Sequence, residues 1–266
     1  MHTHLHPPRL FAAIRRWFAE RSPWVLEHPT EPHEVARALR EHGVEKFAFF
    51  SYAHKAGMAR DLNAWLVATA RDLGPGAVPL ATVHLDDADP AGDVRDALRA
   101  GCAGLKVHEN VQRFDLDDPR LAAVLDAVAE HEGFIMAHIG AIPWSQETHD
   151  GPARVARVLE RHPTLRVVVA HFGAPDHLRY LELAAREPRL FLDTTMAFAP
   201  ESPMRVQIDP AAVERHAGQI VYGTDWPNTP HPYDGELRGL RGLGLSEPAL
   251  RAITSENARR LTPALA

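Results

Sequence analysis

The sequence contains one cysteine, no long apolar run and no excess of basic residues. Cys102 has no internal partner, which excludes a disulfide scaffold and is typical of a protein from a reducing cytoplasm. The apolar runs are far shorter than the roughly 20 residues of a membrane span, and the N-terminal region carries no signal-peptide core. With 29 basic and 35 acidic residues, the net charge of −6 argues against a nucleic-acid partner.

Histidine, by contrast, is abundant, with 17 residues in a chain of 266. Hydrophobic residues make up 45% and charged residues 24%, the balance of an ordinary globular protein. No linker rich in serine or glycine divides the chain, so we expect one domain over residues 1–266. The positions of the histidines therefore carry most of the functional information.

Apolar runs alternate with helical patterns at intervals of about thirty residues, the length of one βα unit. Eight such units predict an α/β fold of the (β/α)8 TIM-barrel class, for which about 250 residues suffice. An open doubly wound sheet is the alternative, and the lack of a glycine-rich dinucleotide loop argues against it. The runs end near His4, Tyr52, His84, His108, His138, His171, Thr195 and Asp225.

The same pattern predicts the individual elements. Apolar or β-branched runs predict buried strands over residues 47–50, 78–83, 104–107, 134–137, 165–170, 190–192 and 219–222. Amphipathic stretches predict helices over residues 34–41 and 61–73, the second ended by Gly74, and a helix opened by Pro119. Asp176 and Asp209 stand where helix N-caps belong.

Candidate metal ligands stand at the ends of these strands. His2 and His4 are two residues apart, so on a strand both imidazoles face one side and can hold one ion. A floppy, tag-like terminus is the other interpretation of that pair. Further strands end in an imidazole or a carboxylate, at His84, His108, His138, His171 and Asp225. A single such histidine could bind a loop carbonyl, but in a barrel these ends meet, which predicts a mononuclear metal site.

Six short motifs follow one another along the chain. They are His2-Thr3-His4, Gly104-Leu105-Lys106-Val107-His108, His138, His171-Phe172-Gly173, Gly223-Thr224-Asp225-Trp226-Pro227 and Glu256-Asn257-Ala258-Arg259-Arg260-Leu261. Together and in this order they resemble the amidohydrolase superfamily, and within it the amidohydrolase-2, or amidohydrolase-related, branch. That branch also includes aminocarboxymuconate-semialdehyde decarboxylase and the resorcylate decarboxylases.

The resemblance implies that His2, His4, His138 and Asp225 hold one divalent metal ion. Zinc is the expected ion, and manganese or iron(II) are the alternatives. It also implies that His171 polarises the substrate or activates the metal-bound water. A bound ion lowers the pKa of water to about 7, and Asp225 can accept the proton and pass it to the leaving group. His171 and Asp225 are therefore the expected catalytic residues.

Lys106 and His108 alternate on one face of their strand and point into the expected barrel. In binuclear relatives a lysine on this strand is carbamylated and bridges two metals. In the branch resembled here the motif serves one metal or none, so we expect Lys106 to be an inner ion-pair partner or substrate anchor. The family's first motif usually begins with an acidic residue. Only Met1 precedes His2 here, which predicts a short first strand or a start further upstream.

Loops at the carboxyl ends of barrel strands carry specificity, so their polar and aromatic residues are candidates for substrate binding. With Lys106, the predicted substrate-binding set is His108, His84, Tyr52, His54 and Trp144, and ordinary loop packing is the alternative for each loop residue. An apolar helical face at about residues 8–20 predicts a lid over the barrel mouth. A helix packed on the barrel end or on a second subunit is the other interpretation.

Three functions fit these residues. The leading hypothesis is a cytoplasmic, metal-dependent hydrolase acting on a carboxylic ester, lactone or amide of a small anionic substrate. A non-oxidative decarboxylase with the same ligands is the second, and a catalytically silent metal-binding protein is the third. The chain leaves little room for a large lid, which favours hydrolysis. We expect a small-molecule partner, no nucleic acid and no membrane, and the chain could pair as a homodimer.

Overall fold

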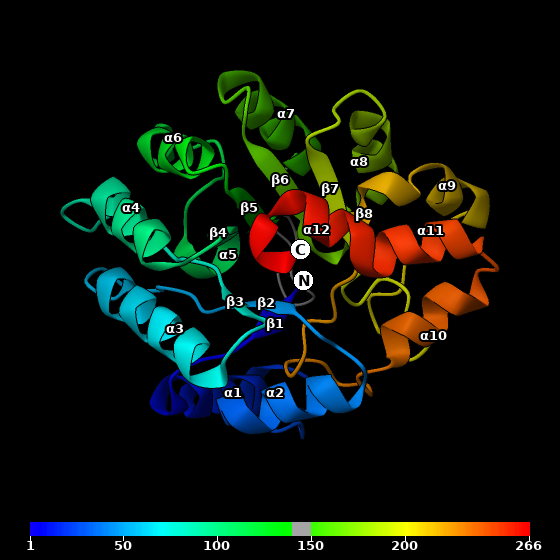
Figure 1. Ribbon diagram of the computed structural model, residues 1–266, viewed down its shortest axis with the longest axis horizontal. Helices are drawn as coiled ribbons and strands as arrows, with labels where there is room; N and C mark the ends of the chain where they lie inside the picture. Colours follow the sequence, from blue (N-terminus) through cyan, green and yellow to red (C-terminus); the bar gives the residue numbers. More distant parts are fainter. Residues whose placement is uncertain (140–149) are drawn as a thin grey trace.

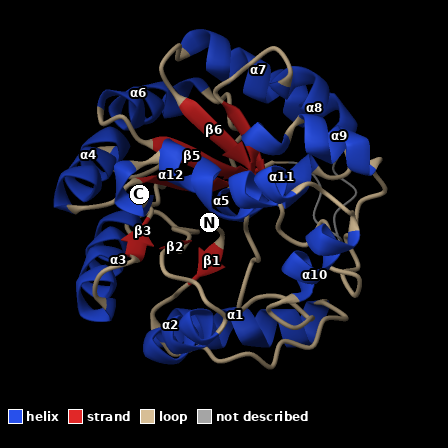
Figure 2. Cartoon of the chain, turned by 45° about the vertical axis from the view of Figure 1, so that its right-hand side comes forward, coloured by secondary structure: helices blue, strands red, loops and turns tan. Residues whose placement is uncertain are grey.

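Eight short strands form the centre of the computed structural model, within its described residues 1–139 and 150–266, and helices surround them (Figure 1). The second view shows the same arrangement of strands inside and helices outside (Figure 2). The strands are β1 (Thr3–His4), β2 (Phe47–Phe50), β3 (Ala77–Pro79), β4 (Gly104–His108), β5 (Phe134–His138), β6 (Arg166–Val169), β7 (Leu190–Asp193) and β8 (Ile220–Val221).

Parallel pairing closes these strands into a barrel. One sheet has the order β1-β2-β3 and the other β4-β5-β6-β7-β8, and every pair is parallel. At one seam Ala81 bridges Leu105, and the Lys106 N–H donates to Ala81 O at 2.8 Å. At the other seam Thr3 bridges Trp226. The prediction of a single-domain (β/α)8 TIM barrel is confirmed, and the open sheet is excluded because both seams are closed.

Alternating side chains of the strands divide between the barrel interior and the layer beneath the helices. Phe134, Met136 and Val168 belong to a buried cluster made mostly of strand residues, which fills the interior. Ile135 and Val167 point the other way and pack with apolar residues of the helices. Both faces of each strand are thus covered, which is why the strands read as continuous apolar runs.

Helices follow most of the strands and form the outer layer. They are α1 (Pro8–Arg21), α2 (Pro32–Glu41), α3 (Ala59–Leu73), α4 (Pro90–Ala100), α5 (Glu109–Gln112), α6 (Ala122–Glu130), α7 (Gly151–Arg161), α8 (His177–Ala184), α9 (Pro210–Arg215), α10 (Gly235–Gly242), α11 (Glu247–Arg251) and α12 (Asn257–Leu261). Shorter 3-10 turns are η1 (Pro119–Leu121), η2 (Ala170–Gly173), η3 (Ala217–Gln219) and η5 (Pro263–Leu265), and η4 (Ala252–Glu256) is a π-helix. No helix among the described residues is both long enough and apolar enough to cross a membrane.

The element boundaries differ from the predicted ones in a few places. Regular β3 ends at Pro79 rather than at residue 83. The Leu80 N–H still donates to Phe49 O, and Ala81 forms the isolated bridge to Leu105. Gly74 ends α3 as predicted, with a φ of +79° that suits glycine. Asp209 caps α9 by accepting from Ala211 N, whereas Asp176 stands at the N-cap of α8 without a side-chain cap bond.

Candidate metal centre and active site

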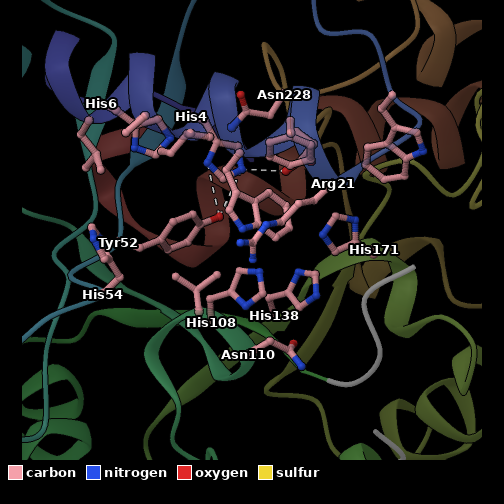
Figure 3. A pocket seen from close by; sticks show the side chains of 18 of the residues that line it. His4, His6, Arg21, Tyr52, His54, His108, Asn110, His138, His171 and Asn228 are labelled. Carbon is pink, nitrogen blue, oxygen red and sulfur yellow. Dashed lines mark hydrogen bonds and ion pairs between the residues drawn. The ribbon is translucent and has the colours of Figure 1, made fainter. Parts of the chain in front are cut away.

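The carboxyl ends of the strands open into one cavity of about 570 Å³ (Figure 3). His4 comes from β1, His108 from β4 and His138 from β5, and all three line the cavity. His171 follows β6 and Asp225 follows β8, and both line it as well. The parallel barrel therefore brings together side chains that are far apart in the sequence, at the end where TIM barrels carry their active sites.

Asp225 makes the tightest contacts of this group. Its Oδ1 lies 2.7 Å from His4 Nε2 and 2.9 Å from His2 Nε2. All three residues are at least nine-tenths buried. Asp225 has a φ of +62°, a left-handed conformation that residues other than glycine rarely adopt. The backbone after β8 is thus held in a costly conformation that carries this carboxylate to the two imidazoles of β1.

His171 completes the group from the other side of the barrel. Donor atoms of His2, His171 and Asp225 all lie within 4.8 Å of one another. The His171 ring is 5.4 Å from that of His2 and 4.6 Å from that of His138. Its φ of +56° is also left-handed, and its Nδ1 is buried without a hydrogen-bond partner in the described structure. His138 in turn stacks on His108 at 3.8 Å.

Asp193, at the end of β7, holds His2 from behind, and the sequence analysis missed it. Its carboxylate is fully buried, and its Oδ2 lies 2.6 Å from His2 Nδ1. Its Oδ1 accepts from the backbone N–H groups of His171 at 2.9 Å and Thr195 at 3.1 Å. One carboxylate therefore positions two members of the site. An acidic residue directly after the apolar run of residues 190–192 was the signal in the sequence.

The charges of the site follow from burial and from its two carboxylates. Burial lowers the pKa of His4 to about 4 and that of His171 to about 4, although Asp225 opposes the shift. Burial raises the pKa of Asp193, but the nearby His2 outweighs it and brings that pKa to about 2. The pKa of Asp225 also lies well below its usual range, because His4 and His2 outweigh the effect of burial. The site thus combines neutral imidazoles with ionised carboxylates.

This donor set suits a divalent metal ion. Ionised Asp193 can only accept, so His2 donates a proton to it from Nδ1, and Nε2 is the ring nitrogen that faces Asp225. This Nε2 lies 2.9 Å from the Asp225 carboxylate and has no hydrogen-bond partner in the described structure. An imidazole nitrogen and a carboxylate oxygen are donor atoms that a divalent ion such as zinc accepts. A carboxylate behind a ligand histidine is also the usual support of a metal site.

The remaining predicted site residues are placed differently. Tyr52 and His54 line the cavity, and the Tyr52 hydroxyl lies 3.3 Å from His4 Nδ1. His84 is not among the lining residues; its Nδ1 accepts from Asp86 N at 3.3 Å. Trp144 lies outside the described residues.

Lys106 lies beneath the cavity and does not line it. It is fully buried inside the barrel, with Nζ 4.6 Å from the ring centre of Phe50 and without a hydrogen-bond partner in the described residues. Burial lowers the pKa of Lys106 to about 8, and Asp193 and Asp225 oppose the shift. The two carboxylates favour the charged form of Lys106, as an inner ion-pair partner would, but no direct ion pair to Lys106 is present among the described residues.

His6 is a second residue that the sequence analysis missed. It is fully buried, its Nδ1 lies 2.7 Å from Ser51 Oγ, and its ring stacks on that of His4 at 5.6 Å. It also contacts Phe11 of α1 edge-on at 4.9 Å. His6 thus connects the segment after β1 to α1. The alternation His2, His4, His6 was the signal, since the third histidine continues the face of the first two.

A family model and several solved structures match this chain. Residues 1–263 match a family model described as Amidohydrolase. The search of curated proteins found no match for this chain.

Several solved structures have the same fold. An uncharacterised TIM-barrel protein from Bordetella bronchiseptica has a TM-score of 0.75 at 19% identity, covering 99% of this chain and 98% of its own. The 5-carboxyvanillate decarboxylase from Sphingomonas paucimobilis has a TM-score of 0.71 at 15% identity, covering 98% and 97%. A probable 2-pyrone-4,6-dicarboxylic acid hydrolase from Acinetobacter baumannii has 0.66 at 13%, covering 98% and 97%. At these identities the likeness concerns the fold alone.

Proposed function

We propose that this chain, which belongs to the amidohydrolase family, is a metal-dependent hydrolase of carboxylic esters, lactones or amides. Members of the family usually bind a metal. The observation that carries the proposal is the contact of one Asp225 oxygen with the Nε2 atoms of His2 and His4, at 2.9 and 2.7 Å. His171, buried and without a hydrogen-bond partner for Nδ1 in the described structure, stands beside them.

His2, His4, His138 and Asp225 are the residues we propose to hold the ion, and zinc fits their nitrogen and oxygen donors. The ion would act as a Lewis acid that polarises the scissile carbonyl and makes water nucleophilic near neutral pH. Asp193 keeps the proton of His2 on Nδ1, so that Nε2 is free to bind. Manganese or iron(II) would accept the same donors.

Two residues handle the proton in this proposal. Asp225 is ionised at neutral pH, so its carboxylate can accept a proton from the attacking water. It returns this proton to the oxygen or nitrogen that leaves, so that water is added across the scissile bond. His171 is neutral, and we assign it a hydrogen bond to the substrate's carbonyl oxygen.

Decarboxylation is a second candidate, because the solved structures with the same fold include the 5-carboxyvanillate decarboxylase as well as the probable hydrolase. The same ligands could hold an aromatic carboxylate, and proton transfer by Asp225 or His171 would then go to carbon. The two reactions differ in their products, since one consumes water and the other releases carbon dioxide.

The test is metal analysis of the purified protein, followed by a substrate panel. Lactones, esters, amides and aromatic carboxylates are incubated with the metal-loaded protein, and acid release and carbon dioxide are measured separately. We expect about one divalent ion per chain and acid release that His171→Ala removes. Carbon dioxide release without acid release would replace hydrolysis by decarboxylation. Protein that binds no divalent metal would refute both.

A further inference from the structure

The cavity extends well beyond the proposed metal ligands and runs along α1. Leu10, Ile14, Trp17 and Arg21 line it, at the i, i+4, i+7 and i+11 positions of the helix. These positions lie on one face, and at 1.5 Å per residue the stripe from Leu10 to Arg21 is about 16 Å long. The end near Leu10 adjoins the metal-binding strand, since His6 contacts Phe11. Arg21 therefore marks the far end.

The walls of this extension are mainly apolar. Val111 from α5, and Met196 and Met204 from the segment after β7, line the cavity together with the α1 stripe. The side chains of Leu10, Ile14, Val111 and the two methionines form no strong hydrogen bonds, and Trp17 adds one indole N–H to an otherwise apolar ring. A molecule lying along α1 would therefore meet apolar surface between the polar metal end and Arg21. The volume of about 570 Å³ is in the range of drug-sized ligands.

The charged groups of the lining are distributed unevenly. Arg21 and Arg113 line the cavity, and Asp225 is the one carboxylate among its described lining residues. Neither guanidinium forms an ion pair or a side-chain hydrogen bond within residues 1–139 and 150–266. The whole chain has a net charge of −6, so this local positive charge runs against the overall balance. Such a cavity attracts anions.

Arg113 and Arg21 reach the cavity from different elements. Arg113 follows α5 with a φ of +61°, in the left-handed region that glycine or asparagine adopts at lower cost. Arg21 ends α1, where a cation also interacts favourably with the helix dipole. The helix dipole of α1 accounts for a cation at Arg21 without any cavity. It does not account for the second guanidinium, that of Arg113, which lines the same cavity from the end of α5. Figure 3 shows Arg21 over the cavity together with the histidines.

From these features we propose that the substrate has an apolar body lying along α1 and a separate anionic group held by Arg21 and Arg113. This inference rests on the proposed hydrolase, because it places the scissile bond at the metal end. The anionic group is then not the group that reacts. It follows that α1 is a wall of the substrate site and selects the substrate, and that Arg21 and Arg113 are specificity-determining residues.

Binding of two probes to the metal-loaded full chain tests the proposal. The probes are 4-phenylbutyrate and its neutral isostere 4-phenylbutyramide, measured by isothermal titration calorimetry. We expect the carboxylate to bind roughly tenfold more tightly, the effect of charge-assisted hydrogen bonds. Arg21→Gln and Arg113→Gln should each reduce carboxylate binding several-fold, and the double variant should bind both probes alike. The matched control Arg16→Gln changes an exposed residue of α1 outside the cavity and should change nothing.

Ile14→Asn, in the middle of the stripe, should lower the affinity for both probes equally. This variant therefore separates the contribution of the apolar wall from that of the two guanidinium groups. A preference for the carboxylate that survives in the double variant and disappears on metal removal would place the anion at the metal and overturn the proposal. Equal binding of both probes to the unmodified chain would also overturn it. Neither readout needs turnover, so a failure of the hydrolase assay is distinguishable from a failure of this inference.

Discussion

Replacing Asp193 by asparagine tests how the proposed metal ligands are held in place. The Asp193 carboxylate contacts His2 Nδ1 through one oxygen and accepts backbone N–H bonds from His171 and Thr195 through the other. In Asp193→Asn the amide oxygen can keep both backbone donors, so the fold should survive. The amide NH₂ would then face His2 Nδ1. Because an NH₂ group only donates, Nδ1 must become an acceptor and the proton of His2 must move to Nε2.

That change of tautomer blocks the atom proposed to bind the ion. Losing such a carboxylate behind a ligand histidine typically reduces metal affinity or activity about 10- to 100-fold. This corresponds to about 1.4–2.8 kcal/mol of binding free energy. We therefore expect the zinc affinity of Asp193→Asn, measured by competition with a chromophoric chelator, to fall by at least tenfold. Circular dichroism should show unchanged secondary structure.

The chain offers a matched control for this experiment. His162 and Asp126 form a second histidine–carboxylate pair, with Nδ1 and Oδ1 2.7 Å apart, and neither residue lines the cavity. Asp126→Asn makes the same chemical change in that pair and should leave zinc affinity within twofold of the unmodified chain. If a folded Asp193→Asn protein also bound zinc within twofold, the tautomer argument would be refuted, and Asp193 would be a purely structural residue.

Three further predictions concern other parts of the site and the barrel. His138→Ala should lower both metal content and activity, whereas His171→Ala should remove most activity and leave most metal bound; equal metal loss in both would make His171 a ligand. Asp225→Asn should reduce turnover about 10²–10⁴-fold even at saturating metal, because the amide cannot accept a proton, and near-normal turnover would restrict Asp225 to a ligand role. Burial raises the pKa of Glu236 from 4.5 to about 8. The folded chain therefore holds a proton there that the unfolded chain releases, and stability should fall as the pH rises from about 5 to 8. Urea denaturation at several pH values should show this slope reduced in Glu236→Gln, and an unchanged slope would show that another group causes it.

Much of the fold was predictable because the strands are buried on both faces and polar residues stand at or shortly after the ends of several of them. That rule located His138 and Asp225 and the eight-fold repeat before any contact was known. It failed for β3, where the apolar run continues to residue 83 but the regular strand ends at Pro79. The length of an apolar run indicates how many residues are buried. The end of a strand depends instead on where the neighbouring strand ends, and the local sequence does not contain that information.

The residues that hold the site in place were harder to predict than the histidines and the aspartate at the strand ends. Asp193 and His6 act through contacts with His2 and Ser51, which are 191 and 45 residues away in the chain. The role of α1 likewise depends on tertiary contacts, because Arg15 donates to Pro227 O at 3.1 Å and ties the helix to the loop after β8. Amphipathicity predicted the helix itself, but it could not show which of its faces meets the cavity.

The seam between Thr3 and Trp226 has a consequence for the order of events during synthesis. β1 is synthesised before the other strands. One edge of β1 pairs with β2, but the other edge has no partner until Trp226, after β8, has been made. His2 and His4 stand on the early side of this seam and Asp225 on the late side. The proposed site therefore cannot form in a nascent chain, however much of the barrel has already folded. The protein should acquire its metal only after nearly all of the chain has emerged, and truncated chains should not retain it.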